Sequence, residues 1–146
     1  MKKVTEELNE SNEEAKDTSA EKINKNYKEE KDKDTKEIIL EKSAKEYFLS
    51  GEDELKKERF NSAVVLFFKS LVSFIDLFIF QQINSTPSSH TERFRILEKK
   101  FPDIYNIIDK DFPFYQDSYV QIMSKELAEV IKEDAKTMAD KTEIKL

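Results

Sequence analysis

The stretch 63-AVVLFFKSLVSFIDLFIF-80 decides the fold of this chain. Its apolar residues lie on nearly every side of a helix, so a helix of this sequence must be covered over most of its surface. A thin polar edge remains at Asn61, Ser62, Lys69, Ser73 and Asp76. We therefore predict a central helix over about residues 59–83, enclosed by the other helices of a bundle.

The same stretch is long enough to cross a membrane. Lys69 and Asp76 lie within it, and each would cost about 2.5–3.5 kcal/mol near the centre of a bilayer. The helix that precedes it is amphipathic and can cover the apolar surface instead. We therefore expect a core helix and no membrane association.

Composition favours an all-α protein. Among 146 residues there are only one glycine and three prolines, and 38% are charged, with many good helix formers. The absence of cysteine excludes disulfides and cysteine metal sites, and one histidine cannot make a zinc cluster. We expect no metal and no cofactor. The net charge of −6 does not suit a broad nucleic-acid-binding face. A cysteine-free chain with no apolar segment behind Lys2 and Lys3 is expected to be cytoplasmic.

The chain divides into a tail and a domain. Residues 1–37 are charged and polar and offer little to bury, so we predict a disordered N-terminal tail. Residues 38–146 are predicted to form an up-and-down bundle of four to five helices, two of them long and antiparallel. The expected helices cover about residues 37–57, 59–83, 90–100, 103–111 and 125–139, with a further turn or two over about residues 114–123.

Several residues are expected to shape these helices. Gly51 is predicted to kink or loosen the first helix, and Pro113 to interrupt the chain after residue 111. Tyr115, Tyr119 and Ile122 have helical spacing beyond that break. The last helix is predicted to begin at a Ser124 cap and to bury one face, made of Leu127, Val130, Ile131 and Met138.

The only histidine of the chain lies in 87-PSSHTERFRILEKKF-101. Ser89 and Glu92 have the spacing of a capping box, in which the serine accepts from the Glu92 amide and the Glu92 side chain reaches back to the Ser89 amide. This makes His90 the first residue of a helix. On this interpretation His90 is structural and needs no chemical role.

A functional interpretation uses the same segment. His90 and Arg93 share one face of the helix, Arg95 and Lys99 share a neighbouring face, and Lys100 extends the first. Helix N-termini and arginines bind phosphate, so these five residues are candidates for binding a phosphate, a nucleotide or an RNA backbone. An imidazole beside a helix N-terminus also tends to stay neutral and could act as a base.

Two further groups are weaker candidates. Tyr115 and Tyr119 are four residues apart, are expected to be half-buried, and could stack on bases. Lys69 and Asp76, with Ser73 between them, could form a polar network inside the bundle. Asp109, Asp111 and Asp117 lack a second set of ligands, so a di-metal site is not expected.

The segment 44-AKEYFLSGEDELKKERFNSAVVLFFKSLVSFIDLFIFQQ-82 resembles the first two helices of HEPN domains, which are small helical bundles. The similar features are Ala44, Tyr47, the Arg59-Phe60 pair at the turn and Ala63 before a long apolar helix. His90 lies where many HEPN sequences open the third helix with a histidine. The resemblance covers about residues 40–140.

The resemblance implies two alternative functions. Some HEPN domains are metal-independent ribonucleases that use an Arg-x4–6-His motif, usually as dimers. Others lack this motif and act as non-catalytic partners, often beside a nucleotidyltransferase in toxin–antitoxin-like pairs. Here Ile83, Asn84 and Ser85 precede His90 where the arginine would stand, so the motif is absent.

We therefore expect a non-catalytic HEPN-like module, homodimeric, that binds RNA, a nucleotide or a protein partner through the His90–Lys100 helix. The first alternative is a divergent ribonuclease that uses His90 with Arg93 and Arg95. The second is a module for protein–protein interaction only.

Overall fold

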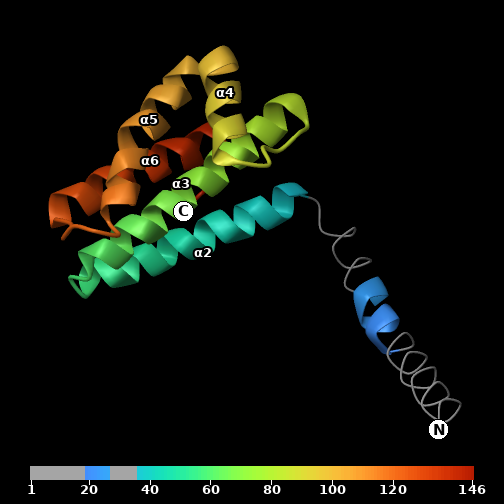
Figure 1. The fold of residues 1–146 in the computed structure, drawn as a ribbon, viewed down its shortest axis with the longest axis horizontal. Helices are drawn as coiled ribbons and strands as arrows, with labels where there is room; N and C mark the ends of the chain where they lie inside the picture. The colour runs from blue at the N-terminus through green and yellow to red at the C-terminus, as the bar shows by residue number, and fades with distance from the viewer. Residues whose placement is uncertain (1–18, 27–35) are drawn as a thin grey trace, which may run out of the picture. The chain divides into compact units, whose positions relative to one another are not determined.

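A computed structural model describes residues 19–26 and 36–146. Residues 19–26 form a short helical segment with exposed side chains. The remaining described residues form five helices and no strand, which confirms the all-α prediction (Figure 1). The helices are α2 (Lys36–Lys56), α3 (Phe60–Ile83), α4 (His90–Lys100), α5 (Pro102–Asp117) and α6 (Lys125–Lys141). Most of the predicted tail, residues 1–18 and 27–35, lies outside the described residues.

Helix α3 is the centre of the bundle, as its apolar sequence predicts. It packs against α2, α5 and α6, and the turn between α2 and α3 makes the two long helices antiparallel (Figure 1). Its buried residues include Phe67, Phe68, Leu71, Phe74 and Ile75. Helix α3 also has the length and composition of a membrane span, but most of that stretch is buried by its neighbours. The bundle therefore accounts for its apolar character.

Gly51 allows the close approach of α2 to α3. The prediction that it kinks or loosens the first helix is wrong, because α2 is continuous from Lys36 to Lys56. Gly51 is buried, and a Cβ atom at this position would lie only 2.7 Å from two ring carbons of Phe67. The residue therefore leaves room for an aromatic ring of the facing helix.

Pro113 does not interrupt the chain, contrary to the prediction. Helix α5 runs continuously through it, from Pro102 to Asp117. Residues on either side of Pro113 pack against α3: the ring of Phe68 stacks on that of Tyr115, with 4.4 Å between the centroids, and contacts that of Phe112 at 6.0 Å. Packing of these rings outweighs the loss of one backbone hydrogen bond at an exposed proline.

The further turn or two predicted over about residues 114–123 is present only as far as Asp117, where α5 ends, and a non-helical connection follows. Tyr115 is half-buried as predicted, but Tyr119 is 69% exposed, so its predicted partial burial is wrong; Ile122 is 94% exposed. Asn61 on α3 holds the connection: its side-chain amide donates to the carbonyls of Ser118 and Gln121 and accepts from the Met123 amide. These three bonds replace the hydrogen bonds that a helix would have made.

Helix α6 begins as predicted. The Ser124 hydroxyl accepts a hydrogen bond from the Leu127 amide at 3.2 Å. The predicted apolar face is right for Ile131 and Met138, which are buried, but Val130 is 40% exposed. Small residues complete the buried face instead, at Ala128, Ala135 and Ala139.

A pair of carboxyl groups links α5 to α6. Asp111 on α5 is fully buried and neither of its carboxylate oxygens has a hydrogen bond among the described residues. Lys110 Nζ lies 2.9 Å from Asp134 Oδ2 on α6 and 3.8 Å from Asp111 Oδ1. Burial and the neighbouring Asp134 raise the pKa of Asp111 to about 8, and Lys110 opposes this only in part. Asp111 therefore holds its proton to a higher pH than an exposed aspartate does.

Asp111→Asn should flatten the pH dependence of stability. Between about pH 4 and about pH 8 the folded protein keeps a proton that the unfolded chain releases, so the free energy of unfolding falls as pH rises. The slope contributed by one such group is at most about 1.4 kcal/mol per pH unit. Urea unfolding at several pH values measures it. The exposed neighbour Asp109→Asn is the control and should keep the wild-type slope; an unchanged slope in Asp111→Asn would contradict the assignment.

Candidate functional site

A buried ion pair joins α4 to α3. The Arg93 guanidinium donates through Nε to Asp76 Oδ1 at 2.6 Å and through Nη2 to Asp76 Oδ2 at 2.9 Å. Arg93 and Asp76 are only 7% and 9% exposed. This two-pronged geometry matches the planar guanidinium to the carboxylate and satisfies both charges inside the bundle. Arg93 was expected to bind phosphate at the surface, but its guanidinium instead pairs with the Asp76 carboxylate of the core helix α3.

The same guanidinium contacts the histidine. Arg93 Nη1 lies 2.8 Å from His90 Nδ1. A guanidinium can only donate, so His90 Nδ1 must accept and cannot carry a proton. The neutral ring then carries its proton on Nε2. His90 is therefore a hydrogen-bond donor at Nε2, and the lone pair that a base would use at Nδ1 is already taken.

The electrostatics favour this neutral form. His90 is exposed as a residue, but its ring contacts that of Phe112, with 5.4 Å between the centroids. This partial burial, followed by the Arg93 charge, lowers the pKa of His90 below 6.5, while Asp76 opposes the shift. The prediction of a neutral imidazole is therefore supported, although its cause is Arg93 and burial.

The start of α4 is capped nearly as predicted. The Ser89 hydroxyl accepts from the Glu92 amide at 3.1 Å, which confirms Ser89 as the cap and His90 as the first helical residue. The Glu92 carboxylate reaches back one residue further than expected, to the amide and hydroxyl of Ser88. These hydrogen bonds lower the pKa of Glu92. Both caps fix the position from which His90 projects.

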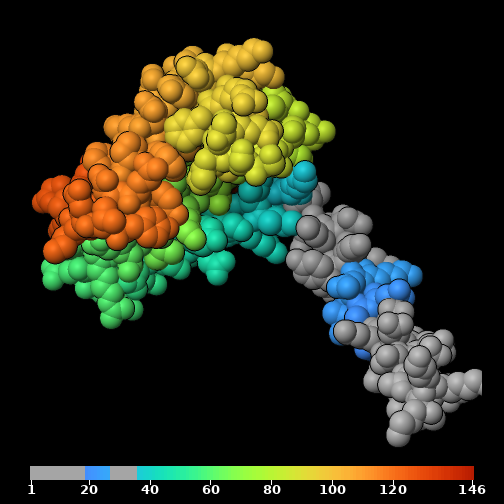
Figure 2. Space-filling view, in the orientation of Figure 1, coloured from blue at the N-terminus to red at the C-terminus, as the bar shows by residue number. Residues whose placement is uncertain are grey.

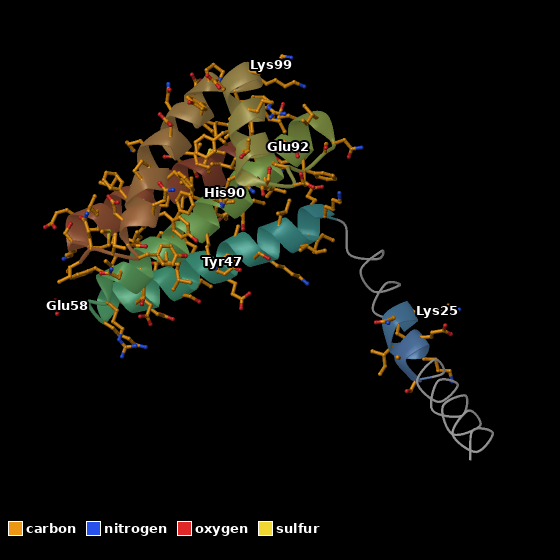
Figure 3. The ribbon with its side chains drawn as sticks, viewed as in Figure 1. Lys25, Tyr47, Glu58, His90, Glu92 and Lys99 are labelled. Atoms are coloured by element: carbon orange, nitrogen blue, oxygen red, sulfur yellow. The ribbon has the colours of Figure 1, made fainter. Side chains whose placement is uncertain are left out.

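A cleft lies beside His90. It has a volume of about 320 Å³, and α2, α3, α4 and α5 all contribute to its walls. Figure 2 shows the recess between α2 and the α4–α5 pair, with α3 at its floor, and Figure 3 shows His90 and Tyr47 on facing elements. The polar and aromatic residues that line it are Tyr47, Lys69, Ser73, His90, Arg93 and Tyr115.

Lys69 supplies the cation of this cleft. Its side chain is exposed, and its ammonium lies 5.8 Å from the centre of the Tyr47 ring, a cation–π arrangement. No carboxylate lies within ion-pair distance of Lys69 among the described residues. The hypothesis that Lys69 and Asp76 form a polar network is wrong, because the partner of Asp76 is Arg93.

The two candidate stacking tyrosines differ in position. Tyr115 lines the cleft, but one face of its ring is stacked on Phe68. Tyr119 is 69% exposed and does not line the cleft; its hydroxyl hydrogen-bonds that of Tyr115 at 2.9 Å. Tyr119 is therefore less buried than expected. The ring of Tyr47, which was not among the predicted site residues, lies beside the cleft cation instead.

The predicted basic cluster of α4 is not one surface. Only His90 and Arg93 line the cleft. Arg95 lines a separate hollow next to it, together with His90. Lys99 and Lys100 lie in the exposed last turn of α4 and line neither hollow, and Figure 3 shows Lys99 at the far end of the helix from His90.

Sequence reasoning missed Lys69, Ser73 and Tyr47 as members of the site. Lys69, Ser73 and Asp76 are four and three residues apart, so they share one face of α3. That polar face within an otherwise apolar helix is the signal that could have located the cleft. Another hollow, about 610 Å³ at the α2–α3 turn, is bordered by Asp53 and Glu54 as well as Lys57 and is less suited to an anion.

The lining of the cleft offers groups that can bind an anion. The cleft is lined by Lys69, by the neutral His90 and by aromatic rings, which suits a ligand with a phosphate and a planar group. Among the described residues no three metal-binding side chains lie together. Comparisons with protein-family models, curated proteins and solved structures give no match. The HEPN resemblance stays a prediction.

Arg93→Ala should lower the free energy of unfolding by about 3–5 kcal/mol, because it leaves the Asp76 carboxylate buried without a partner. Replacing both partners, with Asp76→Leu and Arg93→Met, should restore much of this loss. Urea unfolding provides the measurement. The control is Arg95→Ala on the exposed side of α4, with an expected change of about 0.5 kcal/mol or less. An equally small loss in Arg93→Ala would contradict a buried, desolvated pair.

Proposed function

We propose that the protein is a non-catalytic HEPN-like module that binds a nucleotide, either free or as part of an RNA strand, in the cleft beside His90. The observation that carries the proposal is that Lys69, an exposed lysine, and His90, a neutral ring with its proton on Nε2, line the same cleft. A phosphate accepts from both groups. The Tyr47 ring lies next to Lys69 and offers a planar surface for a base.

The fixed donors of the cleft favour binding over reaction. Arg93 keeps His90 in a single tautomer, and Asp76 keeps Arg93 in place. A ligand phosphate therefore meets a donor that is already oriented, which lowers the entropy cost of binding. The divergent ribonuclease alternative would require a ring nitrogen free to take a proton, and in this arrangement Nδ1 is engaged and Nε2 already holds one.

The wider biological setting in this proposal rests on the HEPN resemblance. It comprises a cytoplasmic homodimer and a nucleotidyltransferase partner in a toxin–antitoxin-like pair. A protein partner that binds elsewhere is compatible with a nucleotide in the cleft. The alternative of a module for protein–protein interaction only assigns no ligand to Lys69 and His90.

Lys69→Ala should weaken nucleotide binding about tenfold, which corresponds to the loss of about 1.4 kcal/mol from one charge-assisted phosphate contact. Fluorescence anisotropy with labelled adenosine monophosphate and with a short labelled single-stranded RNA measures the affinity. Tighter binding of the RNA than of the mononucleotide would identify a strand as the ligand.

The matched control is Lys100→Ala, which removes an exposed lysine of α4 away from the cleft and should leave the affinity unchanged. Binding should weaken with added salt. Absence of binding by the wild type, or equal losses in the two variants, would contradict the proposal. Cleavage of the RNA that is abolished in His90→Ala would favour the ribonuclease alternative.

A further inference from the structure

A second hollow adjoins the cleft, and His90 lines both. It has a volume of about 530 Å³ and lies between α4 and α5. Its remaining lining residues are Thr91, Phe94, Arg95, Glu98 and Phe112. A molecule that contacts His90 from the cleft therefore lies next to this hollow, and a ligand longer than one nucleotide would reach it.

The floor of the second hollow is aromatic. Phe94 and Phe112 are both half-buried, and their rings meet edge to face with 5.5 Å between the centroids. Phe112 also contacts the His90 ring, and Tyr105 braces Phe94 from the other side at 6.0 Å. Rings held in this way form a firm apolar surface, on which a nucleobase can stack at low entropy cost.

The rim of the second hollow carries one charge of each sign. Arg95 and Glu98 are exposed and three residues apart on α4. Neither has an ion-pair partner within 4.0 Å among the described residues. Arg95 is therefore available to a phosphate. The Glu98 carboxylate can accept from the exocyclic amino group of adenine, cytosine or guanine, which uracil lacks.

We infer that the second hollow is a second nucleotide subsite, so that the ligand is a 5′-phosphorylated dinucleotide unit that spans His90. This inference rests on the proposed function of the cleft. The base of the second unit lies on Phe94 and Phe112, and Arg95 holds the phosphate that joins the two units. Glu98 selects a base with an amino group.

The charge distribution explains why the two hollows take different parts of the ligand. In the cleft the Arg93 charge is offset by Asp76, so Lys69 is the free cation. In the second hollow Arg95 is the free cation, and His90 lies between the two positions as a neutral donor. In a ligand with two phosphates, Lys69 binds one phosphate, Arg95 binds the other, and His90 can donate a hydrogen bond between them.

The test compares adenosine monophosphate with the 5′-phosphorylated dinucleotide pApA, by calorimetry on the full chain. The dinucleotide should bind about tenfold or more tightly than the mononucleotide, a gain of about 1.4 kcal/mol. Arg95→Ala should remove most of this gain and leave mononucleotide affinity unchanged. The control Lys99→Ala, on the same helix but outside both hollows, should change neither value.

Base selectivity is tested with pUpU in place of pApA. The wild type should favour pApA severalfold, and Glu98→Ala should reduce this preference. Mononucleotide binding without any gain for pApA, or a gain that survives Arg95→Ala, would overturn the second subsite and leave the proposed function intact. Failure of the wild type to bind either probe would overturn both.

Discussion

The structure depends on the two-pronged ion pair between Asp76 and Arg93. A carboxylate on the most apolar helix of the bundle must be neutralised or fully paired, because an isolated buried charge is very costly. Arg93 meets this requirement only if α4 lies across α3 with its first turn over Asp76. The pair adds little net stability over an apolar pair of the same shape, but it specifies where α4 lies. The position of His90 follows from it.

The fold could be read from the sequence wherever one local signal dominates. The apolar run of α3, the Ser89 and Ser124 caps and the low glycine content all led to the observed helices. The failures occurred where tertiary contacts outweigh local preference. Gly51 was read as a flexible point, whereas the ring of Phe67 needs its missing side chain. Pro113 was read as a break, whereas rings packed against Phe68 keep α5 continuous.

Only part of the candidate site could be predicted from the sequence. Spacing on α4 correctly placed His90 and Arg93 on one face, but spacing cannot show which helix that face meets. Arg93 was therefore taken for a surface ligand although it is buried. The proximity of Lys69 to Tyr47 was not predicted because they come from different helices, and only the packing of α2 on α3 brings them together. The same packing turned the polar edge of α3 into the floor of a cleft.

The central claim is that Asp76, through Arg93, fixes His90 as a neutral donor, and the state of one ring tests it. His90 is the only histidine of the chain, so its ring signals are unambiguous in a long-range nitrogen–proton NMR correlation spectrum. Near neutral pH we predict an uncharged ring with the proton on Nε2 and none on Nδ1. A proton on Nδ1, or a charged ring at that pH, would contradict the account.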